Sequence, residues 1–194
     1  MSVFQMYLKI GIEHIADFKS YDHILFIIAL CVVYPIKQWS KILILITAFT
    51  IGHSTTLVLA TLNIIKVDSQ IIEFLIPATI FISAFANLFQ KSDNFSSNLH
   101  RFKYLLALFF GLIHGLGFSN YLSSLLGNET NIIYPLLAFN IGIEIGQILI
   151  IIAITALSLL VIELFGAKRR EWILIWSGAA IGVASVLMLD RFPW

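Results

Sequence analysis

Residues 133–162 read IYPLLAFNIGIEIGQILIIIAITALSLLVI and hold a single charged residue, Glu144. A helix needs about 20 mostly apolar residues to cross the hydrocarbon core of a bilayer. This stretch is therefore long enough to span a membrane and to tilt or project beyond it. The whole 194-residue chain agrees, because it is 59% hydrophobic and only 12% charged, against roughly 25% charged in a soluble domain. The sequence predicts an all-α integral membrane protein with one transmembrane domain, 1–194.

The same length rule predicts a bundle of about six transmembrane helices. They are expected near 22–36, 41–62, 70–89, 102–126, 131–163 and 171–189. Residues 1–20 are too polar to span, but their apolar side chains recur at helical spacing. This segment is predicted to be an amphipathic N-terminal helix that lies at the membrane interface or folds back into the bundle.

The basic residues predict how the spans are oriented, because cytoplasmic loops are enriched in Lys and Arg. If the spans alternate, one side holds Lys37, Lys41, Lys91, Arg101, Lys103, Lys168, Arg169 and Arg170, and the other holds Lys9, Lys19, Lys66 and Arg191. The first side is predicted to be cytoplasmic, so both termini are expected on the non-cytoplasmic side. The net charge is only +1, so the expected surroundings are a lipid bilayer, with no nucleic-acid partner.

Several ionisable side chains interrupt the apolar runs. A charged side chain at the centre of a bilayer costs about 3 kcal/mol, so such a residue normally faces the protein interior and has a partner there. His23, His53, His114 and Glu144 are the examples here, and Asp22 directly precedes His23. The rise per residue of a helix allows all five to converge in the centre or the predicted outer half of the bundle.

These side chains are nitrogen and oxygen donors, which suit divalent Zn, Ni, Co, Cu(II) or Fe. Cys31 is the only cysteine, so a cluster of thiolates is excluded and a buried apolar role is expected. Candidates for hydrogen bonds that orient metal ligands are Ser54, Asn140 and Gln147. On the helix that carries Glu144, Gly142 and Gly146 would let another backbone approach closely.

Other interpretations of the same residues stay open. Each histidine could be a hydrogen-bonded packing residue, and Glu144 could be a proton relay or an acid paired with a histidine. Ser54 could be a nucleophile beside His53. Adjacent residues in a helix point about 100° apart, however, which favours helix packing for Ser54.

Five short segments resemble the HupE/UreJ family of small bacterial membrane proteins. They are residues 11–14 (GIEH), 21–26 (YDHILF), 53–57 (HSTTL), 110–118 (FGLIHGLGF) and 139–147 (FNIGIEIGQ). The family is regarded as nickel or cobalt permeases, often linked to hydrogenase or urease. The resemblance implies a multi-pass protein of the bacterial inner membrane that handles metal through His14, Asp22, His23, His53, His114 and Glu144.

The favoured hypothesis is therefore a permease for a divalent transition metal such as nickel or cobalt. A cation would lose water at an outer lip made by His14, Asp22 and His23. It would then bind at His53, His114 and Glu144 and leave toward the cytoplasm. Uptake is expected to fall below about pH 6.5, because binding needs neutral imidazoles.

The main alternative is an intramembrane zinc-type hydrolase acting on a lipid or a membrane-bound peptide. Three histidines with an open coordination position hold catalytic zinc, and Glu144 would act as general base with Ser54 or Asn140 as a stabilising group. The predicted inner half offers only neutral groups such as Ser83 and Asn87, which suits a closed pocket better than a path. A metal chaperone without turnover and a homo-oligomer also stay open.

Overall fold

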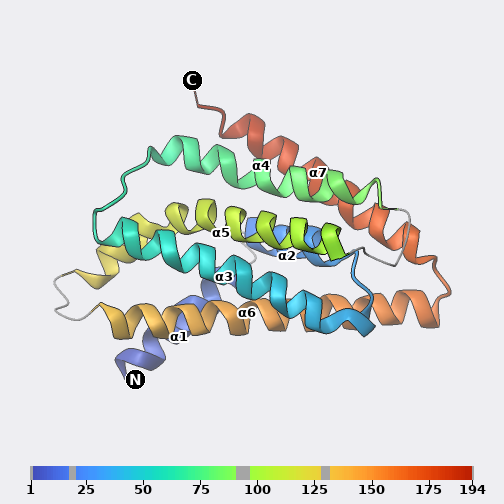
Figure 1. Ribbon diagram of the computed structural model, residues 1–194, viewed down its shortest axis with the longest axis horizontal. Coiled ribbons are helices and arrows are strands. Elements are labelled where there is room, and N and C mark those ends of the chain that lie inside the picture. Colours follow the sequence, from blue (N-terminus) through green and yellow to red (C-terminus); the bar gives the residue numbers. More distant parts are fainter. Residues whose placement is uncertain (1, 18–20, 91–96, 128–131, 194) are drawn as a thin grey trace.

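The computed structural model describes residues 2–17, 21–90, 97–127 and 132–193, and every regular element within them is helical (Figure 1). The α-helices are α1 (Val3–Ala16), α2 (Asp22–Cys31), α3 (Trp39–Thr61), α4 (Ser69–Asn87), α5 (Ser97–Leu126), α6 (Ile133–Leu159) and α7 (Arg169–Asp190). A 3-10 turn, η1 (Ile36–Gln38), precedes α3, and a π-helical turn, η2 (Leu160–Leu164), follows α6. The predicted all-α membrane bundle is confirmed.

Five helices of the described chain, α3 to α7, are long and apolar enough to cross a membrane. The segment expected to be the first span, 22–36, is shorter than predicted, because α2 ends at Cys31 after ten residues. Ten residues rise about 15 Å, which is half of a hydrocarbon core. Pro35 accounts for the early end, because proline disfavours helical backbone at the preceding residue and donates no hydrogen bond.

The bundle has two ends, which lie at the left and right of Figure 1. Both chain termini lie at the left end, where α3 and α5 end and α4 and α6 begin; we call it the termini end. The opposite end carries Lys37, Lys168 and Arg169, and we call it the basic end. α1 starts at the termini end, where the Phe4 ring lies 5.4 Å from the Tyr134 ring of α6. α1 therefore begins at the termini end, and the short α2 comes next along the chain.

Two helix pairs approach so closely that only glycine fits between their backbones. A Cβ atom on Gly111 of α5 would meet the carbonyl oxygen of Phe49 in α3. A Cβ atom on Gly142 of α6 would likewise meet the carbonyl oxygen of Leu8 in α1. The predicted close approach at Gly142 is therefore made by α1, which lies against α6 with Tyr7, Gly11 and Ile15 buried.

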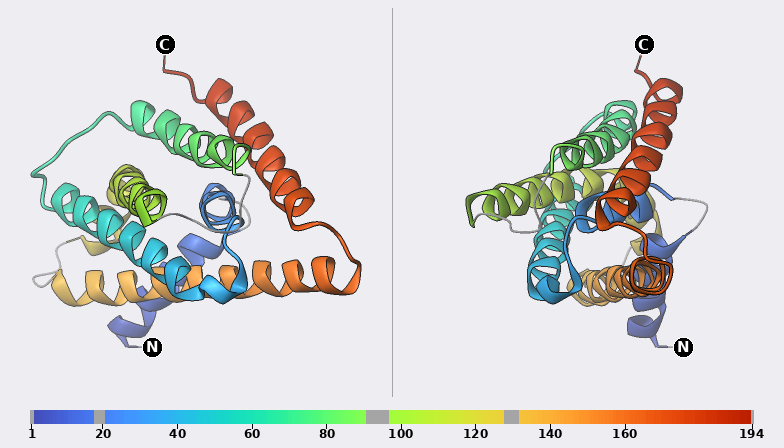
Figure 2. Two further views of the ribbon diagram at one scale, coloured as in Figure 1. Left: turned by 45° about the vertical axis from the view of Figure 1, so that its right-hand side comes forward. Right: turned by 90° about the vertical axis from the view of Figure 1, so that its right-hand side faces the viewer.

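α2 lies inside the bundle, with α4, α6 and α7 around it (Figure 2). Every residue from Phe26 to Tyr34 is buried, including Cys31, as is typical of an enclosed helix. Asn87 of α4 donates a hydrogen bond to the Ala29 carbonyl (2.7 Å), and Arg169 of α7 donates one to the Val33 carbonyl (3.0 Å). The helices thus form three packed units, α3–α5, α1–α6 and α2–α4–α7, which also contact one another where α4 packs on α5 and α3 packs on α6.

The interior toward the basic end is not neutral. Lys103 of α5 is only 8% exposed, and its Nζ donates a hydrogen bond to Asn87 Oδ1 (3.2 Å). The same Nζ lies 5.5 Å from the centre of the Tyr34 ring. The expectation that this half holds only neutral groups is therefore wrong. α5 begins at Ser97 rather than near 102, which places Lys103 inside the packed helix.

Candidate metal centre

Four histidines from four helices meet near the middle of the bundle. They are His14 of α1, His23 of α2, His53 of α3 and His114 of α5. The ring centres of His14 and His23 are 4.5 Å apart, those of His14 and His53 are 5.8 Å apart, and those of His23 and His114 are 5.3 Å apart. A Cβ atom on Gly115 would meet the His53 carbonyl oxygen, so the close packing of α3 on α5 sets the level of His53 and His114.

The tightest set is formed by His14, His23 and His53, which offer one ring nitrogen each within 4.8 Å of one another. His53 and His114 are 0% and 1% exposed. Buried ring nitrogens without a hydrogen-bond partner include Nε2 of His14 and His23, both nitrogens of His53, and Nδ1 of His114. Leaving a buried polar group unsatisfied costs about 1–3 kcal/mol. A divalent transition metal would satisfy these nitrogens, because neutral imidazole is its commonest protein ligand.

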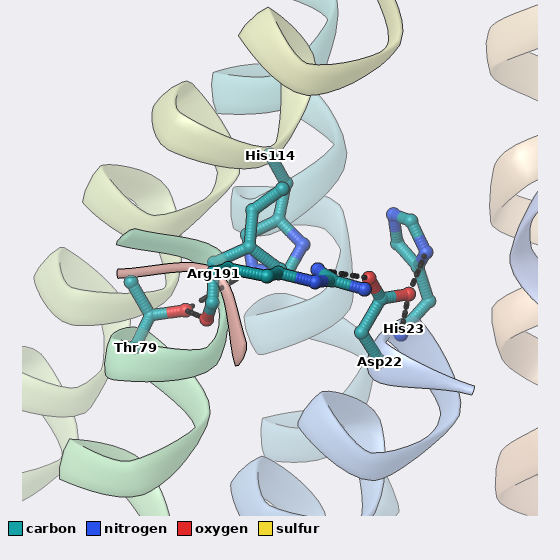
Figure 3. Close-up of polar contacts among 6 residues, drawn as sticks. Asp22, His23, Thr79, His114 and Arg191 are labelled. Atoms are coloured by element: carbon teal, nitrogen blue, oxygen red, sulfur yellow. Dashed lines mark hydrogen bonds and ion pairs between the residues drawn. The ribbon is translucent and has the colours of Figure 1, made fainter. Parts of the chain in front are cut away.

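Two neighbouring side chains determine which nitrogen of His23 and His114 carries the proton (Figure 3). Asp22 Oδ1 lies 3.1 Å from His23 Nδ1, so this nitrogen holds the proton and Nε2 offers the lone pair. Thr79 Oγ1 donates its proton to the Ile76 carbonyl (2.7 Å) and lies 3.1 Å from His114 Nε2. With its proton on the Ile76 carbonyl, Thr79 accepts from that nitrogen, and this arrangement leaves the lone pair on His114 Nδ1. The two nitrogens that offer a lone pair, His23 Nε2 and His114 Nδ1, are both buried without a hydrogen-bond partner.

A pocket of about 980 Å³ gives access to this cluster. His14, His23 and His114 line it, whereas the fully buried His53 lies deeper. The charged residues of its lining are Glu13, Asp17, Asp22, Glu73 and Arg191. Glu73 is near the start of α4 and Arg191 directly follows α7, so the pocket belongs to the termini end.

Aromatic rings cover the cluster toward the basic end. Phe26 and Phe49 are each 1% exposed and Phe110 is 3% exposed. The Phe26 ring lies 4.9 Å from the Phe49 ring and 5.1 Å from the His114 ring. Each phenylalanine is three or four residues from a histidine of its own helix, on the side of the basic end. The cluster is thus open toward the termini end and closed by aromatic packing on the other side.

Two further predicted residues, Glu144 and Gln147, belong to a separate polar layer between α3 and α6. Thr47 Oγ1 donates a hydrogen bond to Glu144 Oε1 (2.7 Å), and Thr50 Oγ1 donates one to Gln147 Oε1 (2.9 Å). Thr47 lies six residues before His53 in α3, about 9 Å nearer the basic end. Among the described residues, the ligand atoms that lie within 4.8 Å of one another are ring nitrogens of His14, His23 and His53, and the Glu144 carboxylate is not part of that set.

In the part of the chain that the structure describes, Ser54 and Asn140 form no hydrogen bond with the four histidines. Ser54 Oγ donates to the Thr50 carbonyl of its own helix (2.6 Å), so its proton is directed at backbone rather than at His53. The Asn140 Oδ1 atom is buried without a hydrogen-bond partner.

Four residues that contact this site were not among those predicted from the sequence. They are Thr79, Phe26, Phe49 and Arg191. Thr79 is one of several polar residues in α4, together with Glu73, Ser83 and Asn87, so no sequence signal singles it out. Phe26 and Phe49 look like ordinary core residues from sequence. Arg191 contacts Asp22 (3.7 Å), but the two residues stand at opposite ends of the chain and no local pattern connects them.

Fold and site together define a multi-pass α-helical membrane protein with a buried cluster of imidazoles drawn from four helices. The chain belongs to the HupE / UreJ protein family, whose family model matches residues 1–191. Comparison with curated proteins and with solved structures found no significant match. The resemblance that the five short segments predict is confirmed over essentially the whole chain.

Proposed function

We propose that this protein is a permease for a divalent transition metal of the nickel and cobalt type, and that the histidine cluster binds the ion as cargo. One observation carries the proposal: three imidazoles from three different helices place ring nitrogens within 4.8 Å of one another beside an open pocket. The HupE/UreJ family is generally associated with nickel and cobalt transport, which supports the same function.

Entry follows from the charges of the pocket. Glu13, Asp17 and Glu73 line it together with Asp22 and Arg191, and this excess of carboxylates attracts a hydrated cation, because a concave site of one predominant charge raises the local concentration of the opposite charge. The ion then exchanges water for the unprotonated nitrogens of His23 and His14 at the pocket and of His53 beneath it. The termini end is the outer side in this proposal, in agreement with the scarcity of basic residues there.

Release toward the basic end requires the helices to move, because Phe26, Phe49 and Phe110 close that side. The four histidines belong to three differently packed units, so a shift of one unit against another both opens the aromatic layer and separates the ligands. Glu144 is hydrogen-bonded to Thr47, which by the rise of α3 lies about 9 Å from His53 toward the basic end. We assign it as the next group that the ion meets on its way inward.

A zinc-type hydrolase is kept as the second candidate, because three imidazoles with an open coordination position are the ligand set of catalytic zinc. The aromatic layer also closes the pocket toward the basic end, so that it opens only toward the termini end. The hydrogen bond from Ser54 to the Thr50 carbonyl favours a packing role for Ser54 over that of a nucleophile. A metal-bound water would have to attack the substrate instead.

The test is uptake of radiolabelled Ni²⁺, Co²⁺ and Zn²⁺ into proteoliposomes by the wild-type protein, His53→Gln and His100→Gln. His100 is the fifth histidine and contacts Tyr34 outside the cluster (3.3 Å), so it is the matched control. We expect time-dependent uptake that His53→Gln abolishes and His100→Gln retains. Protein that binds metal tightly but moves none of the three ions would refute the permease, and hydrolysis of membrane substrates would be screened next.

A further inference from the structure

Asp22 divides its two carboxylate oxygens between two partners. Oδ1 lies 3.1 Å from His23 Nδ1, and Oδ2 lies 3.7 Å from Nη1 of Arg191. Figure 3 shows the guanidinium of Arg191 pointing at the carboxylate, on the opposite side from the His23 ring. The same carboxylate therefore orients a proposed metal ligand and holds a cationic side chain next to the proposed metal site.

Arg191 stands out from its surroundings. Among the described residues that line the pocket, it is the one with a permanent positive charge, whereas Glu13, Asp17, Asp22 and Glu73 are acidic. Its side chain is 32% exposed and that of Asp22 is 13% exposed. The guanidinium is thus partly exposed and lines the same pocket as His14, His23 and His114.

We propose that Arg191 is a built-in competitor for the incoming metal ion: its guanidinium neutralises Asp22 and so weakens binding at His14, His23 and His53. The inference rests on the proposed function. The Asp22 carboxylate attracts a metal ion bound at the neighbouring imidazoles, and a guanidinium paired with that carboxylate cancels the attraction, which is strong where water is largely excluded. A transport site must bind its ion firmly enough to admit it but weakly enough to let it leave. Arg191 keeps the site at the weaker end of that range.

The position of Arg191 does not depend on the ion pair alone. The next residue, Phe192, packs its ring 5.2 Å from the Phe74 ring of α4. Arg170, at the other end of α7, donates hydrogen bonds to the carbonyls of Asn87 and Gln90 (3.2 and 2.8 Å). α7 therefore stays anchored at both ends when the charge of Arg191 is removed, and Arg191→Gln is expected to fold.

The experiment measures the equilibrium dissociation constant for Ni²⁺ on purified full-length protein in detergent, by calorimetric titration at pH 7.5. We expect Arg191→Gln to bind Ni²⁺ about tenfold more tightly than wild type. Arg191→Lys, which keeps the charge, is expected to bind like wild type. Lys9→Gln is the matched control, because Lys9 is an exposed cation near the same end that contacts Glu13 (3.5 Å), and we expect it to leave the affinity unchanged.

The sign of the effect separates competition from structural damage, because a loosened site would bind metal more weakly. The route through Asp22 is tested by comparing Asp22→Asn with Asp22→Asn/Arg191→Gln, which should have the same affinity. Arg191→Gln binding with wild-type or weaker affinity would overturn the inference, as would a gain that persists without Asp22. Wild-type protein that binds no Ni²⁺ would instead refute the proposed function.

Discussion

Gly111→Ala is expected to weaken metal binding without changing any proposed ligand. A Cβ atom at this position would lie 3.0 Å from the carbonyl carbon of Phe49 and 3.0 Å from the backbone nitrogen of His53, with the Phe49 carbonyl oxygen closer still. These neighbours are backbone atoms and cannot rotate away. Carbon atoms in ordinary contact are about 3.5–4.0 Å apart, so α3 and α5 must separate by at least about 0.5 Å.

The size of this shift decides the effect. A metal site tolerates ligand distances within about 0.2 Å of their ideal values, and His53 and His114 lie on the two helices that are pushed apart. We expect Ni²⁺ affinity to fall at least tenfold and the free energy of unfolding to fall by about 1–3 kcal/mol, the usual cost of overpacking.

The assay is Ni²⁺ titration of the purified protein together with thermal denaturation in the same detergent. Gly182→Ala is the matched control, because nothing lies within 4 Å of a Cβ atom at Gly182 in α7. Its affinity and stability should equal those of wild type. If Gly111→Ala also binds Ni²⁺ with wild-type affinity, the close approach of α3 and α5 does not position the histidines, and the reasoning fails.

Three further outcomes are expected. Ni²⁺ affinity should fall in acid, because protons compete for the imidazole nitrogens, and the fall should begin below the usual imidazole pKa of about 6.5, because burial lowers the pKa of His14; affinity that rises as the pH drops would contradict this ligand set. Glu144→Gln should retain Ni²⁺ binding in titration but slow uptake into proteoliposomes at least tenfold, whereas equal loss of both would place Glu144 among the ligands. Thr79→Val should lower Ni²⁺ affinity about threefold to tenfold, because His114 loses the acceptor that holds its proton on Nε2; Thr55→Val, at an exposed hydroxyl that bonds its own helix, is the control in the same titration.

The sequence predicted the spans because length and apolar composition are local properties. It predicted the end of α2 less well, since the apolar run continues through Val32 and Val33 and only Pro35 interrupts it. The early end matters for the site, because Asp22 and His23 lie at the beginning of a half-length helix deep in the bundle and not at the lip of a full span. His14, expected with them at the lip, shares one set of ring nitrogens with the fully buried His53.

Depth along separate helices could not predict which polar residues would face the same space. The rise per residue allows Glu144 and His114 to reach the same part of the bundle, yet Glu144 contacts Thr47 and His114 contacts Thr79. The difference arises from the direction in which each helix faces, and that direction is determined by the glycine contacts between α3 and α5 and between α1 and α6. Contacts such as Arg191 with Asp22 depend on the whole fold and leave no local trace.

The division of the histidines among packed units gives the site its mechanical consequence. His53 and His114 are held in one unit by backbone contacts at Gly111 and Gly115, His14 belongs to the α1–α6 unit, and His23 belongs to the α2–α4–α7 unit. Within two of the units the backbones meet at glycines, whereas different units meet through side chains, some hydrogen-bonded, as Thr79 is with His114, and others imidazoles whose buried nitrogens have no partner. An ion bound there contributes attraction between units that the apoprotein lacks, so binding favours the arrangement in which the units are closest. Any motion that parts the phenylalanines between the same units must weaken that attraction, which links opening toward the basic end to loss of the ion.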